Sequence, residues 1–114
     1  MNERIVKCLY DIRYAIEEID SYFHGGEKKY EDYISNILLK RAIERDLEII
    51  GEASKQLSSE LKSKHQEIPW KEMAGMRDKL IHDYFGVDIE VIWKTISVDI
   101  PNLKLQMELM IKIV

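Results

Sequence analysis

The sequence predicts an all-α protein, an antiparallel four-helix up-down bundle. Apolar residues recur every three or four positions along most of the chain, which is the period of an α-helix. The chain contains only 2 prolines and 5 glycines, which favours long, uninterrupted helices. No stretch shows the strict alternation of a half-buried strand. Amphipathic helices without a sheet must bury their apolar faces against one another, and short connections favour antiparallel neighbours.

Length and composition predict a single domain over residues 1–114. A hydrophobic content of 46% is enough for a modest core. The net charge of −4 opposes nucleic-acid binding by the surface as a whole, so such a site needs a local basic patch or assembly between chains. The single Cys8 excludes an internal disulfide and is typical of a cytoplasmic protein. We expect neither a membrane span nor a signal peptide, because apolar runs are short and the N-terminus alternates charged and apolar residues.

The first helix is expected from about Asn2 to Phe23. Its apolar stripe has alternating spacings of four and three and consists of Ile5, Leu9, Ile12, Ile16, Ile19 and Phe23. The run His24-Gly25-Gly26 should end this helix, because glycine readily takes a left-handed cap conformation. His24 is interpreted as a cap or solvent-facing residue.

The second helix is expected from Lys29 or Tyr30 to Leu61. Gly51 lies inside it at a cost of about 1 kcal/mol relative to alanine, which suggests close approach of a facing helix. A charged cluster lies in the middle of this helix: Arg41, Glu44, Arg45, Glu48 and Glu52. The cluster has two interpretations, a solvated face of i,i+4 ion pairs or a set in which Glu44 or Glu48 orients Arg77.

A third helix is predicted to begin at Ile68-Pro69-Trp70 and to stop at Gly86. On a helical wheel its apolar arc contains Trp70, Met73, Ala74, Leu80, Ile81, Tyr84 and Phe85. Arg77 falls inside this arc, and a permanently charged guanidinium there needs a partner or a cleft that is not core. His82 lies just beyond the edge of the arc.

The fourth helix is expected from about Ile89 to the C-terminus, with Asp88 as its N-cap. Its apolar stripe consists of Ile89, Ile92, Ile96, Ile100, Leu103, Met107, Met110 and Val114. Pro101 lacks a backbone donor and crowds the carbonyl group near Ser97, so we expect a kink in the helix at Pro101 rather than a break.

Arg77 and His82 are the candidate catalytic residues. One cysteine and three scattered histidines provide no metal-ligand pattern, and no phosphate-binding glycine loop or nucleophile elbow is present, so no metal or other cofactor is expected. Metal-free RNA cleavage needs a group that exchanges protons near neutral pH, such as His82, and a cation that holds the phosphate, such as Arg77. Asp78 could hold either of them. The pattern alone favours the plainer interpretation, a helix-end histidine and a salt-bridged arginine.

The string from Arg77 to Tyr84, Arg-Asp-Lys-Leu-Ile-His-Asp-Tyr, matches the R-x-x-x-x-H-x-Y motif of the HepT-like toxins in the HEPN superfamily. Leu47-Glu-Ile-Ile-Gly-Glu-Ala and Ile68-Pro-Trp-Lys-Glu-Met-Ala-Gly-Met-Arg also resemble strings typical of that family. The resemblance covers nearly the whole chain, and three ordered motifs are more specific than a lone R-x-x-x-x-H.

The resemblance implies a homodimer with two such motifs across a shared cleft. It implies a toxin of a toxin–antitoxin system that cleaves RNA without metal through Arg77 and His82. It also implies neutralisation by AMPylation of Tyr84, carried out by a minimal nucleotidyltransferase antitoxin. From the residues alone, Tyr84 can equally be an amphipathic tyrosine with a buried ring and a wet hydroxyl. Two rival functions remain: a non-catalytic substrate-binding or regulatory subunit of that nucleotidyltransferase, and a structural dimerisation domain.

Overall fold

The structure is a computed structural model, and it describes residues 2–24 and 26–113. The α-helices, in chain order, are α1 (Glu3–Tyr22), α2 (Tyr30–Ser35), α3 (Ile37–Lys55), α4 (Ser59–Ser63), α5 (Trp70–His82), α6 (Ile89–Lys94) and α7 (Ile100–Ile113). A short 3-10 turn, η1 (Tyr84–Gly86), follows α5, and a π-helical segment, η2 (Thr95–Asp99), joins α6 to α7. These two described ranges contain no strand, so the all-α prediction is confirmed.

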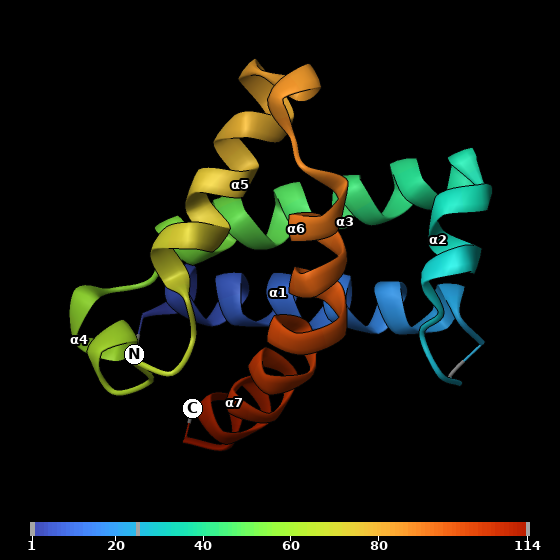
Figure 1. Cartoon of the computed structure of the whole chain (residues 1–114). Coiled ribbons are helices and arrows are strands. Elements are labelled where there is room, and N and C mark those ends of the chain that lie inside the picture. The colour runs from blue at the N-terminus through green and yellow to red at the C-terminus, as the bar shows by residue number, and fades with distance from the viewer. Residues whose placement is uncertain (1, 25, 114) are drawn as a thin grey trace.

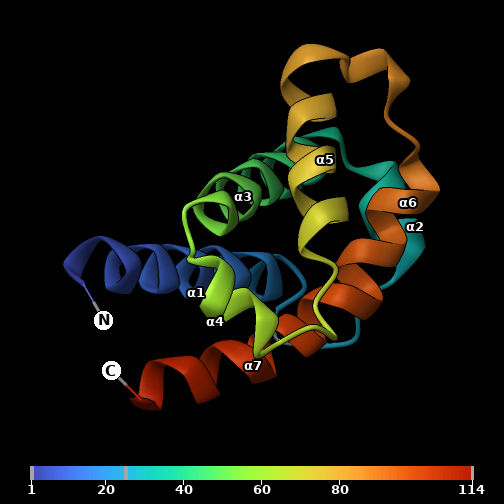
Figure 2. The same cartoon turned by 90° about the vertical axis from the view of Figure 1, so that its left-hand side faces the viewer.

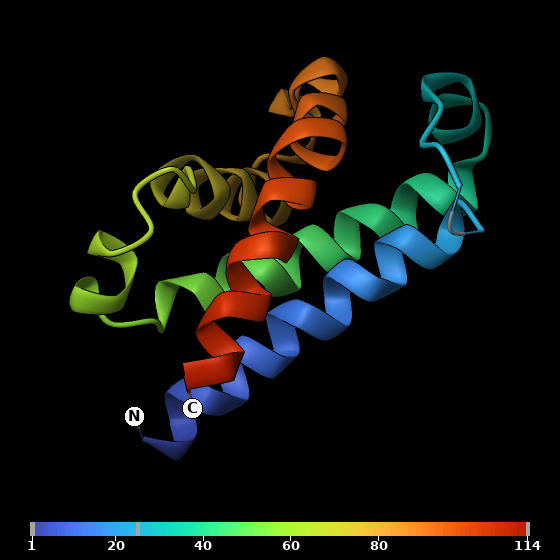
Figure 3. The same cartoon turned by 90° about the horizontal axis from the view of Figure 1, so that it is seen from below.

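Helices α1 and α3 lie side by side, and the remaining long helices cross this pair (Figures 1 and 3). Helix α5 packs on α3, and α7 packs on α1. Figure 2 shows α5 standing steeply to α1, and Figures 1 and 3 show α7 running obliquely to α1, so the arrangement differs from four near-parallel helices. None of the helices in the described ranges is both long and apolar enough to cross a membrane.

The core lies where α1, α3 and the η2–α7 segment meet. Its fully buried side chains are mainly β-branched or unbranched aliphatic residues, which fill an interior densely. The largest of them include Leu9, Ile12, Ile16, Ile19, Ile43, Ile50, Ile96, Ile100, Leu103 and Met107. The predicted stripes of the first and last helices therefore do face the core, except that Ile5 and Ile89 are only partly buried.

Helix α1 begins and ends close to the predicted positions. The side chain of Asn2 accepts a hydrogen bond from the backbone N–H of Ile5 at 2.9 Å, which caps the first turn. The helix ends at Tyr22, and exposed His24 adopts the left-handed conformation with φ 55°. Gly25, which the sequence also assigned to this cap, lies outside the described residues.

The predicted second helix, Lys29 or Tyr30 to Leu61, is three helices, so that expectation was wrong. Asn36 is extended (φ −119°, ψ 105°), and its side-chain oxygen accepts hydrogen bonds from the backbone N–H groups of Leu38 and Leu39, both at 3.1 Å. These bonds begin α3 and interrupt the helical run. In the same way, the Ser58 hydroxyl caps α4 by accepting from the N–H of Leu61 at 3.1 Å.

The last helical run begins as predicted, because Asp88 caps α6 by accepting from the backbone N–H of Glu90 at 2.9 Å. The π-helical segment η2 ends at Asp99, two residues before Pro101, and contains Ser97, whose carbonyl the proline ring would crowd in a regular α-helix. A wider turn there relieves this crowding. The kink at Pro101 itself stays a prediction, and Val114 lies outside the described residues.

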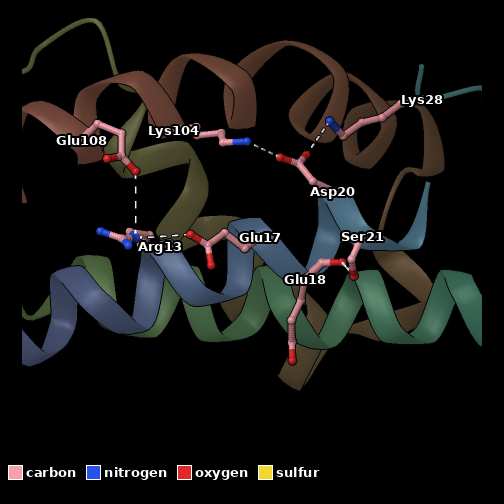
Figure 4. Close-up of polar contacts among 8 residues, drawn as sticks. All are labelled: Arg13, Glu17, Glu18, Asp20, Ser21, Lys28, Lys104 and Glu108. Atoms are coloured by element: carbon pink, nitrogen blue, oxygen red, sulfur yellow. Dashed lines mark hydrogen bonds and ion pairs between the residues drawn. The ribbon is translucent and has the colours of Figure 1, made fainter. Parts of the chain in front are cut away.

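Ion pairs connect α7 and the segment before α2 to α1 (Figure 4). Asp20 on α1 contacts Lys104 Nζ and Lys28 Nζ, both at 2.8 Å. Partial burial alone would raise the pKa of Asp20, but the two ammonium groups outweigh it and leave the pKa below its ordinary value. Arg13 lies 3.2 Å from Glu17 and 3.9 Å from Glu108. Such partly exposed pairs contribute at most about 1 kcal/mol each and mainly fix the position of α7.

Asp46 is a buried carboxyl group on α3, and Tyr22 Oη donates a hydrogen bond to it at 3.0 Å. Burial, together with the neighbouring Glu18 carboxyl group, raises the pKa of Asp46 to about 7. The folded state therefore binds this proton more tightly than the unfolded chain does. The resulting stabilisation is complete below the ordinary pKa of 3.8 and is lost as pH rises through about 7.

We expect Asp46→Asn to flatten the pH dependence of stability in this window, because asparagine stays neutral at every pH. Between pH 4 and pH 8 the Asp46 carboxyl group ionises in the wild type. The melting temperature of the wild type should therefore fall over this range relative to that of Asp46→Asn. Glu27→Gln, at an exposed loop position, is the control and should follow the wild type. Parallel melting curves for wild type and Asp46→Asn would contradict the assignment.

Candidate active site

Helices α3 and α5 approach one another closely at Gly51. A Cβ atom at this position would lie 2.5 Å from Arg77 Cβ and 3.1 Å from the Met73 carbonyl oxygen. Both distances are shorter than normal contacts between such atoms. The close approach predicted from a glycine inside the helix is therefore confirmed, and the facing helix is the one that carries Arg77.

Gly51→Ala is expected to destabilise the fold although alanine is the better helix former. The helix gains about 1 kcal/mol from the exchange, but overpacking a well-filled crossing typically costs about 1–3 kcal/mol. The added methyl group meets Cβ and backbone atoms, which cannot move away as the end of a flexible side chain can. We expect the melting temperature to fall by several degrees, at roughly 4 °C per kcal/mol for a chain of this size.

Gly75→Ala is the matched control because it makes the same chemical change inside α5, where a Cβ would have no atom within 4 Å. This variant should be as stable as the wild type or more stable by up to about 1 kcal/mol. Thermal melts of the three proteins decide between helix propensity and packing. If Gly51→Ala melted above the wild type, the α3–α5 crossing would not be as tight as described.

Arg77 lies on α5 and is held by two carboxylates. Its Nη2 atom lies 3.1 Å from Glu52 Oε2 on α3, and its Nη1 atom donates to Asp78 Oδ1 at 3.0 Å. Lys55 Nζ contacts the same Asp78 oxygen at 2.7 Å. The hydrogen bonds from Lys55 and then from Arg77 lower the pKa of Asp78, so this carboxylate stays ionised and links two cations.

The guanidinium group of Arg77 is not fully satisfied by these partners. Its side chain is 22% exposed, and the buried Nε atom has no hydrogen-bond partner in the part of the chain that the structure describes. Buried donors are normally paired, so the Nε atom is an exception among the described residues. The two Nη atoms carry four N–H groups, and the carboxylate contacts do not use all of them. Arg77 therefore keeps donor capacity beyond its two carboxylate contacts.

The hypothesis that Glu44 or Glu48 orients Arg77 was wrong, since Glu52 takes that position. The reason is geometric, because the α3–α5 crossing is at Gly51 and Glu52 is the next residue. Glu44 lies about 12 Å further back along α3, or two helical turns, and contacts Lys40 and Tyr84 instead. The sequence spacing identified a charged helix face but not the point at which α5 crosses it.

Arg77 opens into a groove between α1, α3 and α5 with a volume of about 310 Å³. It therefore lines a cleft and is not part of the core, which resolves its place inside the predicted apolar arc. The groove carries charges of both signs. Its polar lining comprises Arg4, Lys7, Asp11, Arg45, Glu48, Glu52, Gln56 and Arg77. A charged ligand that binds in this groove must compete with the ion pairs that its side chains already form, such as Arg77 with Glu52.

His82 is the last residue of α5 and its side chain is exposed. The helix ends there because Asp83 leaves the helical conformation (φ −146°, ψ 62°), so the predicted stop at Gly86 was wrong by four residues. The turn η1 then directs Phe85 into solvent, where it is 99% exposed, and Ile81 is 44% exposed. Both residues had been assigned to the buried arc.

The Tyr84 side chain points toward α3 and enters a separate polar cluster. Its hydroxyl donates to Glu44 Oε1 at 2.8 Å and accepts from Lys40 Nζ at 3.2 Å, and Lys40 Nζ also contacts Glu44 Oε2 at 3.1 Å. The Arg41 guanidinium lies 5.1 Å from the centre of the Tyr84 ring. The alternative of a solvent-facing hydroxyl is therefore wrong, because Glu44 is only 4% exposed.

The structure thus separates the motif into two parts. Arg77 and Asp78 lie with Glu52 beside the first groove, whereas Tyr84 lies with Glu44, about 12 Å away along α3. His82 is on the exposed end of α5 between these parts of the sequence. Sequence reasoning missed Lys40 as a partner of Tyr84, and Lys55 as a partner of Asp78. Both lysines are far from their partners in the sequence, so no local sequence pattern could have revealed either contact.

Among residues 2–24 and 26–113, no group of three or more His, Cys, Asp or Glu side chains is arranged to hold a metal ion. The site within the described residues therefore consists of cations, carboxylates, one exposed imidazole and one bonded phenol. Cations and an imidazole are the residue types that recognise phosphate and transfer protons.

Comparison with known proteins agrees with this chemistry. The family model described as Ribonuclease HepT-like matches residues 12–110. A protein of Thermococcus cleftensis named "Probable ribonuclease HepT" is 53% identical over 96 residues, which cover 84% of this chain and 86% of the relative. A relative in Methanocaldococcus jannaschii, provisionally named an RNase, is 44% identical over 98% of this chain and 92% of its own length. No solved structure gives a significant match.

The fold and the family match thus define an all-α protein of the HEPN superfamily. Within it, the chain belongs to the HepT-like ribonuclease family.

Proposed function

We propose that this single-domain protein is the toxin of a toxin–antitoxin system and acts as a metal-independent endoribonuclease. The observation that carries the proposal is the position of Arg77, a partly exposed guanidinium in an open groove at a tight helix crossing, on the same helix as exposed His82. The names of the relatives support RNA as the substrate class. A cytoplasmic location would follow from that substrate.

The proposed reaction is an internal attack within RNA. A base takes the proton of a 2′-hydroxyl, the 2′-oxygen forms a bond to phosphorus, and the bond from phosphorus to the 5′-oxygen breaks. An acid protonates the leaving 5′-oxygen, and the product is a 2′,3′-cyclic phosphate. Arg77 binds the phosphate through its guanidinium fork and stabilises its developing charge. His82 exchanges the proton in one direction or the other.

Two proton transfers and one histidine per motif favour a homodimer, in which two copies of His82 serve as base and acid. The exposed apolar side chains next to the motif support this arrangement. Ile81 and Phe85 flank His82 and its turn, and both are exposed apolar side chains that a second copy of the chain would cover. A shared cleft would also add the cations that a chain of net charge −4 needs around RNA.

Control by a partner enzyme is the second half of the proposal. A minimal nucleotidyltransferase antitoxin would transfer AMP from ATP to Tyr84. The tyrosine oxygen would form a bond to the α-phosphorus, the bond from this phosphorus to the pyrophosphate leaving group would break, and the phenol proton would pass to Glu44 or to solvent. Support comes from Tyr84 Oη, which already donates its proton toward the Glu44 carboxylate at 2.8 Å.

Purified protein incubated with RNA in the presence of EDTA tests the catalytic proposal. We expect cleavage that leaves a 2′,3′-cyclic phosphate. RNA with a single 2′-deoxy substitution at a mapped cleavage site should resist cleavage at that site, because the nucleophile is missing. If the deoxy-substituted RNA were cut there at an undiminished rate, the proposed chemistry would be excluded.

A further inference from the structure

A second groove, which we call the lysine groove, lies between the end of α3, α4 and the first turns of α5. Its volume is about 410 Å³. It is lined by Ser54, Lys55, Ser59, Lys62, Ser63, Trp70, Lys71 and Ala74. Three of these side chains are cationic, and none of the described residues that line it is acidic.

The absence of acids from this lining is unusual for the chain. Its 21 acidic residues outnumber its 17 lysines and arginines, and the groove beside Arg77 contains both kinds. Moreover, the ion pairs among the described residues include neither Lys62 nor Lys71. An acid-free hollow with uncompensated lysines concentrates positive potential and attracts an anionic ligand.

Trp70 provides the lysine groove with an aromatic wall. The indole N–H donates to the His65 carbonyl oxygen at 3.0 Å, which fixes the orientation of the ring. The residue is only partly buried, so part of its surface remains available to a ligand. Lysines beside a fixed aromatic ring match single-stranded nucleic acid, whose phosphates pair with cations and whose bases stack on aromatic faces.

One chain of contacts connects the lysine groove to Arg77. Lys55 lines the groove and contacts Asp78 Oδ1 at 2.7 Å, and the same oxygen accepts from Arg77 Nη1 at 3.0 Å. A nucleic-acid strand that leaves Arg77 would therefore reach Lys55 first and Lys62 and Lys71 next. A small anion, by contrast, is too short to contact both Arg77 and the lysine groove, so it would not bind more tightly because the two sites are adjacent.

We propose that the lysine groove binds the backbone of an RNA strand next to the Arg77 phosphate site, with one base stacked on Trp70. This inference rests on the proposed function in one respect, because it takes RNA as the ligand. It does not require that the protein cleaves RNA. The groove fixes the position of the strand, while Arg77 and His82 act on the bond that is cleaved.

Binding of a fluorescent single-stranded RNA with 2′-O-methyl groups tests the lysine groove, because such RNA binds without being cleaved. We expect Lys62→Glu/Lys71→Glu to weaken binding at least tenfold at moderate salt. The slope of log Kd against log salt should fall by about 1.4, or about 0.7 for each lost phosphate contact to a single strand. Lys29→Glu/Lys112→Glu makes the same change in net charge at exposed positions outside the groove and should bind nearly as well as the wild type.

Stacking has a separate readout. Trp93→Phe leaves Trp70 as the single tryptophan of the chain, so RNA should quench the fluorescence of this variant. If the Lys62→Glu/Lys71→Glu protein bound RNA as tightly as the control pair, the lysine groove would be rejected even if cleavage were real. Lysine-dependent binding without cleavage of unmodified RNA would support the groove and reject the catalytic proposal. Binding of ATP but not RNA at these lysines would overturn the strand assignment.

Discussion

His82→Asn is expected to lower the rate of RNA cleavage by about 10²–10⁴-fold, the usual contribution of a general acid or base. Asparagine can occupy the place of the imidazole but cannot exchange a proton at neutral pH. Because His82 is exposed at the end of α5, its replacement should leave the melting temperature nearly unchanged. A loss of rate without a loss of stability identifies a chemical role.

The chain offers a matched control for this variant. His24 is also exposed at the end of a helix, and asparagine tolerates its left-handed backbone conformation. His24→Asn should therefore keep the cleavage rate of the wild type. Equal rates for His82→Asn and His24→Asn would remove His82 from the mechanism and point to a contaminating nuclease or to another site.

Arg77 requires a different comparison, because its side chain also joins α5 to α3 through Glu52. Arg77→Lys keeps the positive charge but loses the planar fork that binds a phosphate with two parallel hydrogen bonds. We expect this variant to lose about 10²–10³-fold in rate, as when one transition-state donor is removed. Glu52→Gln removes the interhelical ion pair without removing the guanidinium and measures the purely structural contribution.

The helices themselves could be predicted from the sequence because burial imposes a local period on it. The stripe from Leu9 to Ile19 and the cap at Asp88 are both readable within one or two turns. Gly51 was informative for another reason. A glycine inside a helix destabilises that helix, so its presence suggests that a neighbouring segment leaves no room for a side chain, and Arg77 and Met73 occupy that space.

The breaks between helices were harder to predict, because capping competes with a continuous apolar pattern. Asn36 interrupts a run of helix-forming residues by a side-chain bond to the backbone, and the periodicity on either side conceals it. At Asp83 the helix ends without a side-chain cap, because the backbone itself leaves the helical conformation, and this break had a larger effect. Extending the helical wheel past His82 placed Phe85 in the core, whereas the actual backbone directs it into solvent.

The partners within the site could not be predicted, since they depend on how two helices cross. Residues of α3 at three separate levels contact α5 and its turn: Lys40 and Glu44 hold Tyr84, Glu52 holds Arg77, and Lys55 holds Asp78. Only a three-dimensional crossing selects these carboxylates and lysines from the many on the same helix face.

Tyr84→Phe is expected to abolish modification of the protein by the proposed nucleotidyltransferase partner. Phenylalanine lacks the oxygen that would form the bond to phosphorus, so intact-mass spectrometry after incubation with ATP and that enzyme should show no added AMP. Wild-type protein should gain the mass of one or more AMP units and lose its toxicity. Tyr14→Phe, at an exposed tyrosine on α1, should be modified like the wild type.

The surroundings of Tyr84 indicate how the proposed modification would inhibit the protein. AMP on Oη replaces the hydrogen bond to Glu44, which is 4% exposed, with a phosphodiester of the same charge sign. The two anions would compete for the single Lys40 ammonium that contacts both Tyr84 and Glu44, so the nucleotide is expected to turn outward past Arg41, which lies beside the ring. Because Tyr84 follows His82 by two residues, the nucleotide would bring bulk and negative charge close to the proposed RNA site. AMP mapped to Tyr30, or to no tyrosine at all, would reject this account, whereas a toxic, unmodified Tyr84→Phe protein would support it.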